Sequence, residues 1–193
     1  MNLTIRTVDR NDPAAFANYF GSIDFSHKPN WRGCYCQFYV TGGTQEEWQA
    51  RPAALNRAES VERIAGGDMF GFLAYDGEEC VGWCNANDLN TFPRLADRAE
   101  LHVFRGRSAV IVCFVIRPEY RGKGVGSALI EAVVEHFRAE GYDRVLAQPW
   151  VNKENPQAAY HGTPHMYERL GFVRAGGDDE DPIYAYEFRK GDA

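Results

Sequence analysis

The spacing of apolar positions changes along this chain, and each spacing predicts a different element. Residues 109–116 are almost continuously apolar and rich in β-branched side chains, which is typical of a central strand covered on both faces. Residues 127–139 repeat apolar side chains at intervals of three and four, which is the period of an amphipathic helix. Glycines at positions 122, 124 and 126 separate the two segments. The pattern therefore predicts a buried strand, a glycine-rich turn and a helix in succession.

Weaker patterns predict further elements on both sides of this unit. Strands are expected at residues 3–8, 69–75, 80–85, 144–147, 172–173 and 183–188. Helices are expected at residues 13–20, 44–66 and 164–170, the second of them interrupted or kinked at Pro52. A hairpin is expected at Asp76-Gly77, because this dipeptide favours a tight turn between two strands. Together these elements predict a mixed α/β fold.

Length, composition and charge narrow the class of protein. A chain of 193 residues, 45% hydrophobic and 25% charged, predicts one globular domain over residues 1–193. Its net charge of −6 argues against nucleic acid as a partner. No apolar run reaches membrane-spanning length and the first residues are unlike a signal peptide, so no membrane partner is expected. Five cysteines without a disulfide-like framework predict a reducing, cytoplasmic location.

The glycine-rich turn has the properties of an anion site. Glycines let the backbone approach a ligand closely, and the first N–H groups of a helix have no partner within the helix. The helix dipole adds positive potential at the same point, and Arg117, Arg121 and Lys123 add charge. These features predict a phosphate-bearing ligand at residues 122–127, and a tight turn without a ligand is the alternative. Neither the Walker pattern nor the dinucleotide-binding pattern fits this turn.

The run Arg121-Gly-Lys-Gly124-Val-Gly126 resembles the R/Q-x-x-G-x-G/A acyl-CoA signature of the GNAT superfamily, the GCN5-related N-acetyltransferases. The leading R-P-E-Y-R-G and the trailing S-A-L are also typical of that family. In its order of elements, the chain resembles the family over roughly its whole length. The resemblance implies the GNAT fold, with a mostly antiparallel central sheet flanked by helices. It also implies acetyl-CoA as co-substrate, with no metal.

The resemblance further implies which residues hold acetyl-CoA. The pyrophosphate is expected on the backbone amides of residues 122–127, and the pantetheine arm along the edge of the central strand. Asn155 resembles a further family asparagine, but it lies twelve residues ahead of Tyr167, because residues 160–165 look like an insertion. The expected cofactor-binding residues are Phe114, Val115, Ile116, Arg121, Gly122, Lys123, Gly124, Val125, Gly126, Ser127 and Asn155.

Acyl transfer to an amine benefits from an acid and a base. Tyr167, in M-Y-E-R-L-G-F, matches the tyrosine of the family motif Y-x-x-x-G-F, and the resemblance implies that it protonates the departing thiolate. The alternative is a tyrosine that packs beside the cofactor without a proton role. No spacing selects the base, and a bound water with a backbone carbonyl would also suffice. The candidates by residue type are Glu100, His102, Glu119, His161 and His165.

Two further groups of residues have both a functional and a structural interpretation. Cys34 and Cys36 are compatible with a metal or redox pair, but structural zinc usually has four ligands. If residues 34–40 form a strand, both thiols lie on its apolar face in the core, which is the simpler interpretation. An aromatic set is expected either to line the acceptor pocket or to pack in the core. Its members are Trp31, Tyr35, Tyr39, Trp83 and Trp150.

The expected function is transfer of an acetyl group from acetyl-CoA to a primary amine. The resemblance implies that the amine attacks the thioester directly in a ternary complex, without an acyl-enzyme. A small-molecule amine is the expected partner, in preference to a basic or nucleic-acid-associated protein. Because an acidic surface attracts cationic amines, a basic peptide stays open as an alternative, and so does a homodimer. Two alternatives stay open: a non-catalytic acyl-CoA-binding sensor domain, and a thiol-redox or zinc protein built on Cys34 and Cys36.

Overall fold

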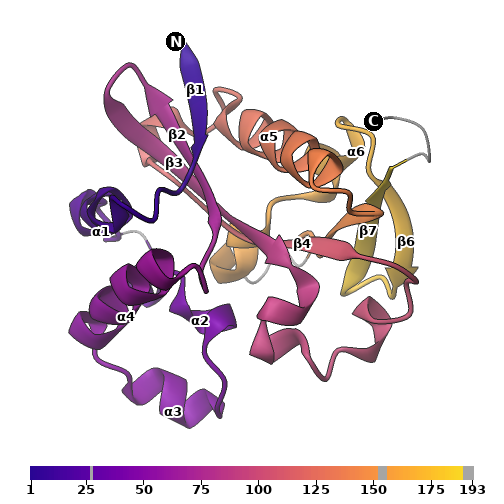
Figure 1. Cartoon of the computed structure of the whole chain (residues 1–193), viewed down its shortest axis with the longest axis horizontal. Coiled ribbons are helices and arrows are strands. Elements are labelled where there is room, and N and C mark those ends of the chain that lie inside the picture. The colour runs from indigo at the N-terminus through magenta and orange to yellow at the C-terminus, as the bar shows by residue number, and fades with distance from the viewer. Residues whose placement is uncertain (27, 152–155, 189–193) are drawn as a thin grey trace.

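The computed structural model of the chain describes residues 1–26, 28–151 and 156–188. Its described strands form one seven-stranded sheet in the order β1-β2-β3-β4-β5-β7-β6 (Figure 1). Neighbouring strands are antiparallel except β4 and β5, which are parallel. The strands are β1 (Leu3–Thr7), β2 (Gly71–Asp76), β3 (Glu79–Asp88), β4 (Ser108–Ile116), β5 (Arg144–Ala147), β6 (Val173–Gly177) and β7 (Pro182–Glu187). The predicted mixed α/β fold with a mostly antiparallel sheet is confirmed.

Helices cover both faces of the sheet (Figure 1). The longest, α5 (Val125–Ala139), packs on one face, and α1 (Pro13–Ser22) and α4 (Ala53–Gly66) pack on the other. The shorter α-helices are α2 (Gln37–Val40), α3 (Gln45–Ala50) and α6 (Pro164–Glu168). The 3₁₀ helices are η1 (Pro29–Trp31), η2 (Leu89–Thr91), η3 (Pro93–Leu95), η4 (Ala99–Leu101), η5 (Pro118–Tyr120) and η6 (Pro156–His161).

β4 lies at the centre of the core and contributes side chains to both layers. Phe114 packs in the cluster that contains Leu129 of α5, whereas Val115 packs in the cluster that contains Phe16 of α1. This alternation follows from the two-residue period of a strand. Because both faces of β4 are covered, its sequence is apolar at nearly every position, as the pattern over residues 109–116 predicted.

The sheet opens between β4 and β5. Pairing joins residues 108–111 of β4 to residues 144–147 of β5, so no described strand pairs with residues 112–116 on that side. On its other side, β4 has a register shift, with Asn85 opposite Cys113 and Ala86 opposite Ile111. Val112 is therefore an extra residue, which makes a β-bulge and bends the strand. The second half of β4 thus has one edge without a strand partner.

Several local signals gave correct boundaries. Thr44 and Glu47 form the predicted capping box, in which each side chain accepts the other residue's backbone N–H. The helical segment is interrupted at Pro52, which separates α3 from α4. The predicted hairpin is also present, since Asp76 pairs with Glu79 across the turn between β2 and β3. These features depend on residues close together in the sequence.

The strand expected at residues 34–40 is wrong. Gln37–Val40 forms the short helix α2, and Tyr35 and Cys36 have left-handed φ angles of 44° and 51°. A hydrogen bond from the Gln37 amide to the Cys34 carbonyl closes the turn at 2.9 Å. Trp83 Nε1 also donates to Cys36 Sγ at 3.1 Å. A contact with the distant strand β3 thus helps hold the turn, and short apolar alternation cannot reveal it.

Candidate functional site

The glycine-rich turn leads from β4 through η5 into α5. Gly122 and Gly124 have φ angles of 71° and 87°, and Gly124 is the N-cap of α5. L-residues avoid this region, so glycine is required by the backbone conformation. An added Cβ at either position would meet no atom within 4 Å. The space beside both α-carbons is therefore open, as a turn that receives a ligand requires.

The turn places the other predicted anion-binding residues together. The Ala128 amide donates to the Gly124 carbonyl at 3.0 Å, so the N–H groups of residues 125–127 belong to the first turn and have no partner within the helix. Val125 and Gly126 are buried, and a Cβ at Gly126 would lie 3.1 Å from Met166 Sδ of α6. Lys123 is exposed, and its Nζ lies 5.5 Å from the centroid of the Tyr120 ring. Packing underneath thus fixes the start of α5.

The unpaired half of β4 begins beside this turn. The Arg117 amide donates to the Val81 carbonyl at 3.0 Å, which sets the alternation of backbone groups along β4. Val115 therefore faces β3, and its carbonyl also accepts a hydrogen bond from the Tyr19 hydroxyl at 2.7 Å. The backbone groups of Phe114 and Ile116 face the other side, where β5 has diverged.

A hydrogen bond from Arg121 joins the strand edge to the turn. Arg121 Nε donates to the Ile116 carbonyl at 3.1 Å, and the Arg121 side chain is exposed. An open glycine turn at a helix start and a strand edge without a partner therefore meet at the end of β4. This arrangement fits a ligand that carries both a diphosphate and an arm with amide groups.

Tyr167 of α6 lies fully buried at the same junction. Its hydroxyl donates to the backbone carbonyl of His161 at 2.9 Å, and its ring packs edge-on against Phe172. Burial raises the pKa of Tyr167 well above its ordinary value, and the nearby Cys84 and Cys113 thiols raise it further. Tyr167 therefore stays protonated at neutral pH.

Gly162 allows the chain to pass closely over Tyr167. Its φ angle is 77°, and an added Cβ would lie 2.6 Å from Met166 Cε and 3.2 Å from Tyr167 Cε2. Phe114 Cε2 of β4 would be 3.6 Å away, which places this segment beside the unpaired half of that strand. The Trp150 amide donates to the Gly162 carbonyl at 2.9 Å and fixes the segment from its other side.

Of the five candidate bases, His161 is the one whose backbone carbonyl accepts the Tyr167 hydroxyl. His161 Nε2 lies 3.1 Å from the Tyr39 hydroxyl, and its Nδ1 has no solvent contact and no hydrogen-bond partner. Burial lowers the pKa of His161 to about 4, and the positive charge of Arg98 lowers it further. The ring is therefore neutral at physiological pH.

The other four candidates have less suitable surroundings. Glu100 forms an ion pair with Arg98, and His102 Nε2 lies 3.0 Å from the Leu95 carbonyl. Glu119 and His165 are exposed on η5 and α6. Residue type alone did not distinguish among these five, because the difference lies in burial and partners. Asn155, predicted as a cofactor contact, lies outside the described residues.

Asn85 is a polar residue that sequence reasoning missed. It is 1% exposed on β3, directly opposite Cys113 at the bulge of β4, and neither Nδ2 nor Oδ1 of its side chain has a hydrogen-bond partner. Most buried polar side-chain atoms are hydrogen-bonded, so this amide is unusual. An asparagine between apolar strand residues gave no signal of this isolation.

The aromatic set was expected either to pack in the core or to line the acceptor pocket, and its members differ in where they lie. Trp83 is fully buried and packs edge-on against Phe16, so it belongs to the core. Tyr39 is partly exposed beside His161, and Trp31 packs edge-on against Tyr160 of η6. These latter rings lie where α2, η1 and η6 come together.

The thiols of Cys34 and Cys113 have raised pKa values and stay protonated at neutral pH. Burial raises the pKa of Cys34 to about 12, with the neighbouring Cys36 adding to the shift. The pKa of Cys113 is raised by its contact with Cys36 and then by burial. Thiols with raised pKa values are poor nucleophiles and poor metal ligands. Within the described part of the chain, no three His, Cys, Asp or Glu side chains are arranged to hold a metal ion.

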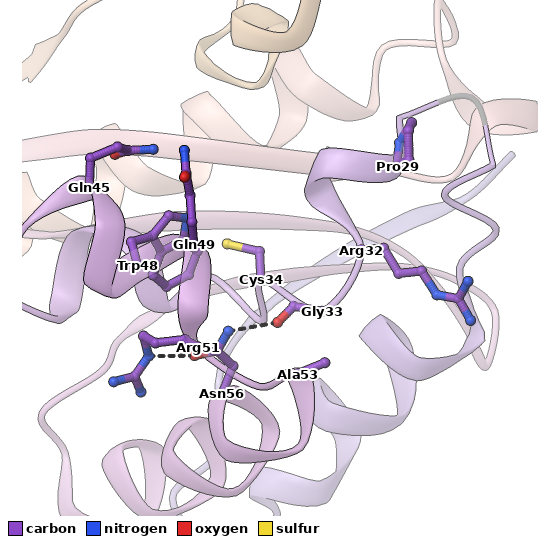
Figure 2. A pocket seen from close by; sticks show the side chains of 10 residues that line it. All are labelled: Pro29, Arg32, Gly33, Cys34, Gln45, Trp48, Gln49, Arg51, Ala53 and Asn56. Atoms are coloured by element: carbon purple, nitrogen blue, oxygen red, sulfur yellow. Dashed lines mark hydrogen bonds between the residues drawn. The ribbon is translucent and has the colours of Figure 1, made fainter.

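A separate cavity of about 470 Å³ lies between η1, α3 and α4. Figure 2 shows Cys34 Sγ directed into it toward Trp48 and Gln49. Asn56 closes its floor by donating to the Gly33 carbonyl at 2.8 Å and accepting from Arg51 Nε at 2.8 Å (Figure 2). Of the predicted cofactor-binding residues that the structure describes, none lines this cavity.

Comparison with known proteins identifies the family. The model of the acetyltransferase (GNAT) family matches residues 29–172. A curated relative, the N-alpha-acetyltransferase MAK3 of Arabidopsis thaliana, is 31% identical over 104 residues, which are 54% of this chain and 45% of that protein. The aligned region thus spans less than half of the relative's length. The chain belongs to the GNAT family of acetyltransferases.

Solved structures share the fold over nearly the whole chain. Aminoglycoside acetyltransferase AAC(6')-Ib in complex with coenzyme A has a TM-score of 0.57 and 18% identity, covering 96% of this chain and 95% of that one. A chain of the NatC complex bound to Gag peptide and CoA has a TM-score of 0.54 and 14% identity, covering 98% and 100%. The GNAT fold expected from the glycine motif is therefore confirmed. Among the described helices, none has the length and apolar character to span a bilayer.

Proposed function

We propose that this chain is a cytoplasmic N-acetyltransferase that moves an acetyl group from acetyl-CoA to the primary amine of a small molecule. The observation that carries the proposal is the junction at the end of β4. There the open glycine turn of α5 meets the unpaired strand edge, and Arg121 bridges the two through its bond to the Ile116 carbonyl. The proposal treats residues 1–193 as one domain.

Acetyl-CoA supplies the acyl group as a thioester. In the proposal, the first-turn amides of Val125, Gly126 and Ser127 bind its diphosphate, because these N–H groups carry the positive end of the helix dipole. Gly122 and Gly124 keep the approach free of side chains, and Arg121 and Lys123 add charge. The pantetheine arm lies along residues 114–116, with Phe114 and Ile116 offering the backbone groups and Val115 holding the strand against β3.

A small cationic amine is the proposed acceptor. The net charge of −6 attracts cations over a distance, which favours such an acceptor over an acidic one. The fold neighbours include an enzyme named for aminoglycosides, which are small amines, and a complex bound to a peptide. A peptide α-amine is therefore the acceptor against which the small amine has to be compared.

Tyr167 is the proposed general acid. Its raised pKa keeps the hydroxyl protonated, and it lies beside Gly162 at the β4 edge, where the thioester would be presented. To act, the hydroxyl exchanges its bond with the His161 carbonyl for one with the departing sulfur. The nitrogen of the acceptor attacks the carbonyl carbon directly, so no side chain has to form an acyl-enzyme.

The engaged hydroxyl also favours a second candidate function. Tyr167 already has a hydrogen-bond acceptor and no exposed surface, so it can be explained as a structural residue. The chain would then be an acyl-CoA-binding sensor domain without chemistry. The two functions agree on ligand binding and differ only in turnover.

One pair of measurements separates them. Isothermal titration with acetyl-CoA and with CoA measures binding, and thiol release from acetyl-CoA measures transfer to kanamycin, to spermidine and to a short peptide with a free α-amine. Binding with thiol release that depends on an amine supports the transferase. Binding without release for any amine supports the sensor, and the absence of binding to both ligands contradicts both functions.

A further inference from the structure

We propose that His161 takes the proton from the attacking amine, and that Nδ1 of its ring is the accepting atom. The assignment rests on the proposed function, because it adds a residue to the same reaction. Five residues in the sequence were candidates for this role by their type. The structure distinguishes His161 from the other four candidates by the surroundings of one atom, Nδ1 of its ring.

The His161 ring is held at one nitrogen and unoccupied at the other. Nε2 lies 3.1 Å from the Tyr39 hydroxyl, and the ring of Tyr160 lies against the imidazole with centroids 4.2 Å apart. Nδ1 has no contact with solvent and no hydrogen-bond partner within the described part of the chain, although the side chain as a whole is partly exposed. Buried polar atoms usually have partners, so Nδ1 is placed to meet a group that the protein itself does not supply.

The partners of Tyr39 determine which nitrogen carries the proton. The Tyr160 hydroxyl also interacts electrostatically with the Tyr39 hydroxyl. When Tyr39 directs its one proton toward Tyr160, its oxygen accepts Nε2–H from His161. Nδ1 then keeps its lone pair, which is the state that a base requires. The opposite tautomer would bury an N–H without an acceptor, and orphaned buried donors are rarer than orphaned acceptors.

The surroundings keep this ring neutral before the reaction. Burial lowers its pKa to about 4, and Arg98, near η4, adds a positive charge that opposes protonation. Among the residues that the structure describes, the titratable groups on this side include Tyr39 of α2, Tyr160 of η6 and Cys113 of β4, each of which has a raised pKa. These three groups are therefore uncharged at neutral pH and do not stabilise an imidazolium. The lone pair of Nδ1 is thus available across the physiological range.

The backbone places His161 next to the proposed thioester site. Its carbonyl accepts the Tyr167 hydroxyl, and Gly162, the next residue, lies against Phe114 of β4. Its side chain points the other way, toward Tyr39 of α2. His161 therefore lies between the cofactor side of β4 and the helices on the acceptor side. A nitrogen that approaches the β4 edge from α2 would pass this ring.

The proton transfer balances with the acyl transfer. The cationic acceptor first loses its ammonium proton to solvent, because only the neutral nitrogen has a lone pair for attack. As this nitrogen bonds to the carbonyl carbon it becomes more acidic, so a base with a low pKa can accept its next proton. The proton passes to Nδ1, the carbon–sulfur bond breaks, and the leaving sulfur takes a proton from the Tyr167 hydroxyl. His161 then returns its proton to solvent and Tyr167 recovers one. No oxidant, reductant or further reactant is needed.

The first test compares three variants with the best acceptor found among kanamycin, spermidine and the peptide. His161→Gln keeps a polar atom for Tyr39 but removes Nδ1, and His161→Ala removes the whole ring. His165→Ala is the matched control, since this exposed histidine lies four residues away. We expect kcat to fall about 100-fold or more in both His161 variants, with the Kd of acetyl-CoA within about twofold and the control unchanged. Added imidazole should restore His161→Ala in proportion to its concentration.

Rescue by imidazole distinguishes a proton acceptor from a packing residue. Activity within about threefold of wild type in His161→Ala, or a loss that imidazole does not restore, overturns the proposal. If wild type turns over none of the amines, the proposed function fails instead. ¹⁵N NMR of the wild-type ring between pH 5 and pH 8 then decides on its own: a neutral ring with hydrogen on Nε2 supports the proposal, and hydrogen on Nδ1 overturns it.

Discussion

The hydroxyl of Tyr167 donates a hydrogen bond to the backbone carbonyl of His161 at 2.9 Å. This contact ties α6 to the end of η6, and it holds together the two residues that we assign to proton transfer. In the proposed reaction, the hydroxyl that positions His161 is the one that also protonates the leaving sulfur. Its structural and chemical roles therefore have to be separated by experiment.

Replacing Tyr167 with Phe removes both roles together. We expect the free energy of unfolding to fall by about 1–3 kcal/mol, because the His161 carbonyl loses its partner in a buried region. We also expect kcat to fall by about tenfold or more, with little change in the Kd of acetyl-CoA. Urea denaturation, steady-state kinetics and calorimetry measure the three quantities.

Tyr184→Phe is the matched control for this variant. Tyr184 is also buried, and its hydroxyl donates to Glu168 Oε1 at 2.8 Å and not to the His161 carbonyl. It should lose stability without losing kcat. Full kcat in Tyr167→Phe would contradict the acid role and leave Tyr167 as a packing residue.

Replacing Gly124 with alanine should weaken cofactor binding, and the same replacement at Gly141 separates this effect from backbone strain. Gly124 and Gly141 lie at opposite ends of α5, both have positive φ, and an added Cβ meets nothing within 4 Å at either position. Each alanine should therefore cost about 1–2 kcal/mol of stability through backbone strain. Only Gly124→Ala places a methyl group where the diphosphate is proposed to lie. Calorimetry with acetyl-CoA should show weaker binding for this variant. Equal affinities in the two variants would show that the turn is not part of the binding site.

Acid should destabilise the protein through His161. Its pKa is lowered to about 4 in the folded state, against an ordinary value of about 6.5, so between these values the unfolded chain binds a proton that the folded chain does not. Stability from this group is present above about pH 6.5 and is lost as the pH falls, by up to about 1.4 kcal/mol per pH unit. His161→Gln should lack this component. Urea denaturation at several pH values compares the slopes, and parallel slopes would mean that the ring titrates normally.

The isolated amide of Asn85 should cost stability. Its two polar atoms have no partner, so Asn85→Leu, which keeps the branching and the number of side-chain heavy atoms, should raise the free energy of unfolding by about 1–2 kcal/mol. Asn87→Leu on the same strand is the comparison, since Asn87 Oδ1 accepts the Asp88 amide at 2.8 Å and that bond would be lost. Thermal denaturation of both variants tests this. A destabilised Asn85→Leu would show that ordered water satisfies the amide.

The sequence by itself determined those structural features that depend on residues close together in the chain. The apolar run at residues 109–116, the period of α5 and the glycines between them predicted the strand, the turn and the helix, because each property is encoded within a few positions. The interruption at Pro52 and the hairpin at Asp76-Gly77 followed in the same way. The family resemblance rested on the same short turn.

Only the tertiary structure decided the features that depend on partners far apart in the chain. Trp83 is 47 residues from Cys36, and its bond to the thiol belongs to the turn that made residues 37–40 a helix and not a strand. Tyr39 is 122 residues from His161, and burial beside it gave one histidine a low pKa and a free nitrogen. Burial and hydrogen bonding between such residues are set by how the sheet and helices pack, which local spacing does not encode.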